Sequence, residues 1–209
     1  MTSTNSQVVL EPNLNLPQDI LQELQEHIAT SRVVPSFFNL SANTGKTFWE
    51  KLLFKFYFGT GQFQVYRIDQ ALEDRITAHY QDFLKLIPTP AKIRLKSTQG
   101  VRSLLPHSDA AEGGDTASLT IAVVTNGEIT NWHNAGPEFK TTPFSLLRLK
   151  KTKSVCLEPG QACLFNNSAV HSVTNCQPGA KRYVLTIGWQ TVDFDQVLKA
   201  REAWNDHNH

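Results

Sequence analysis

Two residues in the segment LLPHSD, His107 and Asp109, are of types that could bind a metal ion. They stand two positions apart at the end of a short apolar run and before the turn-like segment AAEGG. If the run is the end of a β-strand, residues two apart project from the same face, so the imidazole and the carboxylate converge. That arrangement suits a divalent cation. The alternative is a strand end followed by a turn-forming aspartate.

His171 is a third candidate ligand, 62 residues after Asp109 in the strand-like segment AVHSV. Two histidines and one carboxylate that leave open positions are typical of non-haem Fe(II) oxygenases. Zinc hydrolases also use two histidines and a carboxylate, but their helical HExxH motif is absent from this chain. His133 is a rival ligand, although its place in the loop-like segment TNWHNAGP predicts an exposed side chain.

Arg182 adds a positive charge eleven residues after His171, at the head of the segment RYVLTIGW. On a strand, its side chain would share a face with those of Val184 and Thr186. An arginine beside a strand hydroxyl is well suited to bind a carboxylate through two hydrogen bonds. The alternative is that Arg182 points to solvent, and Lys181, on the other face, is its rival.

The first 90 residues are expected to form helices that support these motifs. Apolar residues recur every three or four positions in segments 16–31, 47–59 and 70–88. Pro17 stands at a helix-opening position, and Pro88 ends the last segment.

From residue 92 the apolar period changes to that of short strands separated by Gly, Pro, Asn or Asp. Because no helical segments lie between them, these strands predict a sandwich, a barrel or a jelly roll. The candidate strands are 91–97, 102–108, 117–125, 144–151, 154–159, 161–167, 169–175 and 182–190. We expect a mainly β (α+β) single domain over 1–209, with a helical buttress over 1–90, a β-unit over 91–190 and a closing helix or tail over 191–209.

Three segments give the chain a resemblance to a known family. LLPHSD, EPGQACLFNNSAVHSV and GAKRYVLTIGW resemble the signature blocks of the Fe(II)/2-oxoglutarate-dependent oxygenases, in particular the prolyl-4-hydroxylase-like branch. The resemblance covers about residues 92–190 and does not extend to the N-terminal helices. It implies a double-stranded β-helix, a jelly roll whose mouth holds iron.

The resemblance also implies roles for particular residues. His107, Asp109 and His171 would bind Fe(II), and Arg182 would pair with the distal carboxylate of the cosubstrate 2-oxoglutarate, with Thr186 adding a hydroxyl. The cosubstrate would chelate iron and leave one position for O2. The implied activity is that of a dioxygenase, a hydroxylase acting on a C–H bond with release of succinate and CO2.

The chain departs from the family pattern in two places. The family's tyrosine shortly before HxD is missing, and Thr98 stands at about that position, which predicts a different cosubstrate pocket. The family's GGxL turn appears only as TNGEITNWHN, so the loop on the substrate side is particular to this chain. The presence of Asp109 argues against halogenation, because family halogenases have a small residue there.

Composition limits the partners of this protein. The formal net charge is +1, from 20 Lys and Arg against 19 Asp and Glu, so no overall field favours nucleic acid or an anionic membrane. The N-terminus has no signal-peptide pattern, and no run approaches 18 apolar residues, so we expect a soluble cytoplasmic protein. The three cysteines lack CxxC spacing and predict free thiols rather than a disulfide framework. The oligomeric state cannot be read from the sequence.

The leading hypothesis is therefore an Fe(II)/2-oxoglutarate-dependent hydroxylase that acts on a small molecule, an amino acid or a peptidyl side chain. Basic and polar residues near the motifs, namely Arg94, Lys96, Arg102 and Asn131, could anchor an acidic or zwitterionic substrate. The alternative hypothesis is a cupin-like jelly roll that binds metal without oxidation, as an isomerase, a sensor or a binding module.

Overall fold

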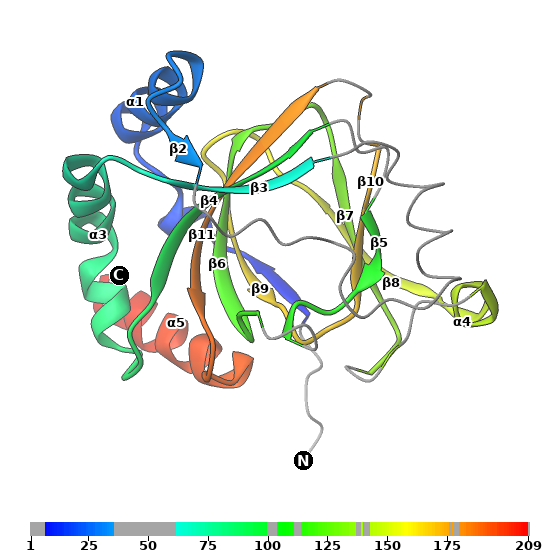
Figure 1. Ribbon diagram of the computed structural model, residues 1–209. Coiled ribbons are helices and arrows are strands. Elements are labelled where there is room, and N and C mark those ends of the chain that lie inside the picture. Colours follow the sequence, from blue (N-terminus) through cyan, green and yellow to red (C-terminus); the bar gives the residue numbers. More distant parts are fainter. Residues whose placement is uncertain are drawn as a thin grey trace.

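Two antiparallel sheets form the walls of a barrel in the computed structural model, which describes residues 7–35, 62–99, 104–110, 114–136, 139, 143–175, 177 and 180–208. Figure 1 shows the arrangement. The seven-stranded major sheet has the order β1 (Val8–Leu10), β9 (Ala162–Asn166), β6 (Ala117–Val124), β11 (Lys181–Trp189), β4 (Lys92–Gln99), β3 (Gln62–Arg67) and β2 (Val34–Pro35). The minor sheet has the order β5 (Leu104–His107), β10 (His171–Thr174), β7 (Ile129–His133) and β8 (Lys151–Cys156). This is the predicted jelly roll.

Three helices, α1 (Gln18–Ala29), α3 (Gln70–Lys85) and α5 (Phe194–Asn208), cover the outer face of the major sheet. A short 3-10 helix, η1 (Pro12–Leu14), precedes α1. The start of α3 is capped by Asp69, whose carboxylate accepts hydrogen bonds from the backbone N–H groups of Ala71 and Leu72. The predicted helices at 16–31 and 70–88 are thus confirmed, whereas the predicted helix at 47–59 lies outside the described residues.

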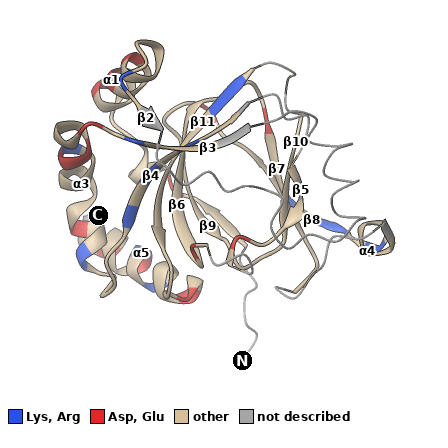
Figure 2. Cartoon of the chain, viewed as in Figure 1, with Lys and Arg blue, Asp and Glu red and all other residues tan. Residues whose placement is uncertain are grey.

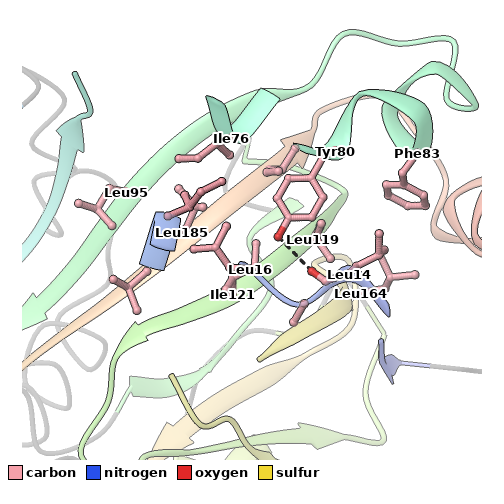
Figure 3. Close-up of a cluster of buried hydrophobic side chains, with 14 of the residues drawn as sticks. Leu14, Leu16, Ile76, Tyr80, Phe83, Leu95, Leu119, Ile121, Leu164 and Leu185 are labelled. Carbon is pink, nitrogen blue, oxygen red and sulfur yellow. Dashed lines mark hydrogen bonds between the residues drawn. The ribbon is translucent and has the colours of Figure 1, made fainter. Parts of the chain in front are cut away.

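The main hydrophobic core lies between α3 and the major sheet. Ile76, Tyr80 and Phe83 of α3 pack against Leu119 and Leu185 of the sheet, and all five are at most 1% exposed. Figure 3 shows this cluster. It also shows the Tyr80 hydroxyl donating a hydrogen bond of 3.0 Å to the backbone carbonyl of Leu14, which ties α3 to η1.

Strand β11 is buried on both faces, and its alternation sets up the interior of the barrel. Tyr183, Leu185 and Ile187 belong to the helix-side core. Because successive side chains point to opposite faces, Val184 and Thr186 face the barrel interior. The same alternation places one set of β6 and β4 side chains inside the barrel.

The N-terminal region also supplies strands, which the helical pattern of its sequence did not predict. The strands β1, β2 and β3 all join the major sheet, and β1 pairs with β9 from the other end of the chain. The strands β1 and β2, of three and two residues, have too short a pattern to be recognised before their partners are known, whereas the six-residue β3 was missed.

The predicted strand at 144–151 is wrong. Residues Pro143–Arg148 form a short helix, α4, and the following strand β8 begins at Lys151. Pro143 is favoured at the first position of a helix, and Leu and Arg are good helix formers. Because Phe144 and Leu147 are 79% and 84% exposed, the apolar residues read as strand are not part of the core.

Within the described part of the chain, no helix combines the length and the apolar character needed to cross a lipid bilayer. Figure 2 shows that many of the acidic residues lie on the helices, and that basic residues occur on strands β4, β8 and β11.

Candidate metal centre

His107, Asp109 and His171 converge at one point, and one ligand atom of each lies within 4.8 Å of the others. The sheet register explains why. His107 ends β5 and His171 begins β10, and the two residues are direct cross-strand partners in this antiparallel pair. Residues opposite one another share a face, so both imidazoles point the same way. Asp109 follows His107 by two positions and joins them.

The distances suit one cation. Asp109 Oδ1 lies 3.3 Å from Nε2 of His107 and 3.9 Å from Nε2 of His171. Two ligand atoms that are each about 2.1 Å from a cation and at right angles to one another are about 3 Å apart. The donor set of two imidazoles and one carboxylate therefore fits a transition metal such as Fe(II) without a large rearrangement.

His171 is held with its Nε2 available for a metal. Its Nδ1 lies 3.0 Å from the backbone carbonyl of Ala169 and can donate a proton to it, which selects the tautomer with a lone pair on Nε2. The ring of Phe165 meets the imidazole edge-on at a centroid distance of 4.8 Å. Burial lowers the pKa of His171 to about 4, so the ring is neutral at pH 7, as a metal ligand must be.

Asp109 is ionised at neutral pH. Burial acts to raise the pKa of its carboxyl, but the hydrogen bond from His107 and the nearby charges hold that pKa well below the ordinary value. The turn that carries it is fixed by the backbone N–H of Gly114, which donates to the Asp109 carbonyl at 2.9 Å. A side chain at Gly114 would crowd that carbonyl, so a glycine is required at this close approach.

Arg182 and Thr186 lie four residues apart on β11, so their side chains share one face of the strand. Thr186 is buried, and its hydroxyl donates to the backbone carbonyl of Arg94 at 3.3 Å. Arg182 is half-buried, whereas the rival Lys181 is exposed.

Arg182 is electrostatically close to Glu128. Burial acts to raise the pKa of the Glu128 carboxyl, but hydrogen bonds from Asn126 and Thr125 and the charge of Arg182 hold it below its ordinary value. The strip of β11 from Arg182 to Thr186 thus presents a cation and a hydroxyl on the face that looks into the barrel.

Arg94 and Asn131, both considered as substrate anchors, have partners within the protein. Arg94 forms a 2.6 Å ion pair with the buried carboxylate of Asp115. Asn131 is fully buried, and its side chain is hydrogen-bonded to Thr174 and Ser154. Asn131 also pairs with Ser172, the neighbour of His171, so it faces away from the triad. The third candidate, Arg102, lies outside the described residues.

His133 is not the exposed loop residue that its neighbours in sequence indicated. It ends strand β7 and is 9% exposed, and its Nε2 lies 2.9 Å from the hydroxyl of Ser172. Trp132 pairs with His171 across the sheet, so His133 points to the opposite face. That geometry removes His133 as a rival ligand.

A buried polar cluster on the interior face of the barrel was not anticipated from the sequence. The hydroxyls of Ser118 and Thr120 are 3.1 Å apart, and the side-chain amide of Asn167 donates to Ser118 at 3.2 Å. Ser118 and Thr120 alternate with apolar residues on β6, so they share one face of the strand. The alternation alone does not tell whether that face meets solvent or a buried polar interior.

No protein-family model matches the sequence, and no curated protein matches it. Solved structures do match the fold. A prolyl hydroxylase from Trichoplax adhaerens, in complex with a hypoxia-inducible-factor peptide fragment, has a TM-score of 0.51 and 13% identity, covering 93% of this chain and 87% of the other.

Two further structures are similar over most of both chains. HygX from Streptomyces hygroscopicus, with nickel and 2-oxoglutarate bound, has a TM-score of 0.52 and 8% identity, covering 90% of this chain and 84% of the other. The epimerase SnoN, in complex with Fe3+, alpha ketoglutarate and nogalamycin RO, has a TM-score of 0.52 and 14% identity, covering 88% and 79%. The chain therefore has the jelly-roll fold found in Fe(II)- and 2-oxoglutarate-dependent enzymes.

Proposed function

We propose that this protein is an Fe(II)- and 2-oxoglutarate-dependent dioxygenase. The observation that carries the proposal is the convergence of His107, Asp109 and His171 inside a jelly roll. Two proteins of similar fold, HygX and SnoN, are described as complexes with a metal ion and 2-oxoglutarate. This supports the proposal that a metal ion and 2-oxoglutarate bind here too.

Each residue of the site has a role in this proposal. His107, Asp109 and His171 hold Fe(II) and leave open positions for the cosubstrate and O2. Arg182 binds the distal carboxylate of 2-oxoglutarate through its planar guanidinium, and Thr186 adds a hydrogen bond when its hydroxyl turns from the Arg94 carbonyl to that carboxylate. When bound, iron and 2-oxoglutarate supply an oxidant made from O2, with succinate and CO2 as co-products.

The surrounding residues fix the geometry. The Ala169 carbonyl orients His171, and Phe165 packs against its ring and keeps water from that side of the site. Trp132, fully buried beside Phe165, extends this apolar wall. The chain itself therefore contributes position, charge and exclusion of water.

We propose hydroxylation of a small molecule, an amino acid or a peptidyl side chain as the outcome. The similar structures hold bound molecules of both sizes, a peptide fragment in one and nogalamycin RO in another. Because SnoN is described as an epimerase, the same fold and cofactors also serve other outcomes, which the substrate's placement decides.

The test is the formation of succinate. Protein loaded anaerobically with Fe(II) is mixed with 2-oxoglutarate and O2, alone and with a panel of small metabolites and peptides. We expect slow release of succinate without substrate and faster release with the right one, since a bound substrate excludes water from the oxidising site.

Matched histidine variants make the test specific. His171→Ala should abolish succinate release, whereas His133→Gln, on the opposite face of the same sheet, should retain it. If iron-loaded wild-type protein forms no succinate under any condition, the proposal fails and the cupin-like metal-binding module replaces it.

A further inference from the structure

Lys96 projects into the barrel beside the strip formed by Arg182 and Thr186. On β4 its neighbour Leu95 is fully buried in the helix-side core, so Lys96 faces the interior. Lys96 pairs across the sheet with Val184, which stands midway between Arg182 and Thr186 on β11. Adjacent strands are about 4.8 Å apart, so the Lys96 side chain starts next to the centre of this strip.

The Lys96 ammonium makes no hydrogen bond or ion pair with any residue that the structure describes, although the side chain is half-buried. Arg94, the preceding inward residue on β4, differs because Asp115 pairs with its charge. A half-buried ammonium without a hydrogen-bond acceptor among the described residues favours a ligand that supplies one, and an anionic ligand suits its charge best.

The charge of Lys96 acts on two residues of the triad. Burial acts to raise the pKa of Asp109, and the positive charge of Lys96 is among the effects that lower it. Burial is the main cause of the lowered pKa of His171, and the charge of Lys96 adds to it. The ammonium is therefore close to the ligand side of the site as well as to β11.

We propose that Lys96 binds the 2-oxo carboxylate end of 2-oxoglutarate, the end next to the triad, while Arg182 binds the distal carboxylate. This inference rests on the proposed function. The flexible stem of a lysine suits the task, because it can bring a point charge to a carboxylate that the metal already orients.

The balance of charge agrees with this assignment. Fe(II) contributes two positive charges, Asp109 and Glu128 two negative ones, and Lys96 and Arg182 two positive ones, which leaves a net charge of +2. The two carboxylates of 2-oxoglutarate neutralise that charge. Without Lys96 the loaded site would carry a net negative charge in a half-buried position, which is unfavourable.

The experiment compares two ligands that differ at one end. 2-Oxoglutarate and 2-oxobutyrate share the 2-oxo carboxylate, but only the former has a distal carboxylate. Their affinities for anaerobic Fe(II)-loaded protein are measured by calorimetry in wild type, Lys96→Met, Lys96→Gln and Lys96→Arg. The matched control is Lys92→Met, which removes an exposed lysine of the same strand, hydrogen-bonded to Gln190.

We expect Lys96→Met and Lys96→Gln to lower the affinity for both ligands by a similar factor, about ten- to a hundredfold. This is the effect that the loss of a hydrogen bond to a charged group predicts. Lys96→Arg should restore most of the affinity, and Lys92→Met should bind like wild type. Fe(II) affinity and the unfolding temperature should not change, because Lys96 is neither a ligand nor part of the core.

Two results would overturn the inference alone. Either both neutral variants bind both ligands as wild type does, or they lose affinity for 2-oxoglutarate but not for 2-oxobutyrate, which would place Lys96 at the distal end. Failure of the proposed function is distinguishable, because iron-loaded wild-type protein would then bind neither ligand.

Discussion

Replacing Arg94 by methionine should destabilise the protein more than replacing Asp115 by asparagine. The two groups form a 2.6 Å ion pair, but the Asp115 side chain is 1% exposed whereas that of Arg94 is 26% exposed. Without Arg94, the Asp115 carboxylate is left as an unpaired buried charge, which costs about 3 to 5 kcal/mol. Without the carboxylate, Arg94 keeps partial access to water, so Asp115→Asn should cost only about 1 to 3 kcal/mol.

The Asp115 carboxylate has neither a second hydrogen-bond partner among the described residues nor space to move. Its Oδ1 has no hydrogen-bond partner among the described residues, and its carboxylate lies against Gly188, where an added Cβ would overlap it. Gly188→Ala should therefore displace the carboxylate and destabilise the protein as the Asp115 variant does.

The assay is urea unfolding at pH 7, followed by the fluorescence of the buried Trp132 and Trp189. Lys85→Ala is the control, since it breaks the exposed Lys85–Asp82 pair and should change the free energy of unfolding by less than about 0.5 kcal/mol. An Arg94→Met protein that is at least as stable as Asp115→Asn would refute a structural role for the ion pair. If Arg94→Met keeps its stability and loses turnover, Arg94 is a substrate anchor rather than a structural residue.

Three other predictions concern the site and its surroundings. Each of His107→Ala, Asp109→Ala and His171→Ala should remove stoichiometric Fe(II) binding and leave the circular dichroism spectrum unchanged; a variant that retains iron would exclude its residue from the triad. Arg182→Ala should weaken the binding of 2-oxoglutarate about ten- to a hundredfold, and Arg182→Lys should weaken it less, because Arg182 is half-buried. The affinity for Fe(II) should not change, because Arg182 is not a metal ligand. Equal weakening by Lys181→Ala would contradict the strand register. Burial, aided by the charge of Lys151, lowers the pKa of His133. Below about pH 6.5 the unfolded protein therefore binds more protons at this histidine than the folded protein does, and stability should fall on acidification. His133→Gln should lose less unfolding free energy than wild type between pH 7 and pH 5.5, and an equal loss would show that other groups titrate.

The motifs that bring the triad together could be read from the sequence because they depend on local rules. HxD at the end of β5 and His171 at the start of β10 need only the strand period and one cross-strand pairing. The helices of 16–31 and 70–88 could likewise be predicted, because their apolar residues recur over enough positions to show the period of an α-helix.

The partners of individual residues could not be read in this way. The ion pair of Arg94 could not be predicted because Asp115, its partner, is 21 residues away in the sequence. His133 appeared exposed because its neighbours are loop formers, yet β7 extends to it and the pairing with β10 decides its face. These are tertiary contacts, and no local pattern of one sequence specifies them.

The most direct measurement is an anaerobic titration of the Fe(II)-loaded protein with 2-oxoglutarate, followed by visible absorption. We expect a weak charge-transfer band that saturates at one 2-oxoglutarate per iron, that is absent in His171→Ala and that persists in His133→Gln. Stoichiometric iron binding by the wild-type protein with no band at any concentration of 2-oxoglutarate would contradict the proposal that 2-oxoglutarate binds to the iron.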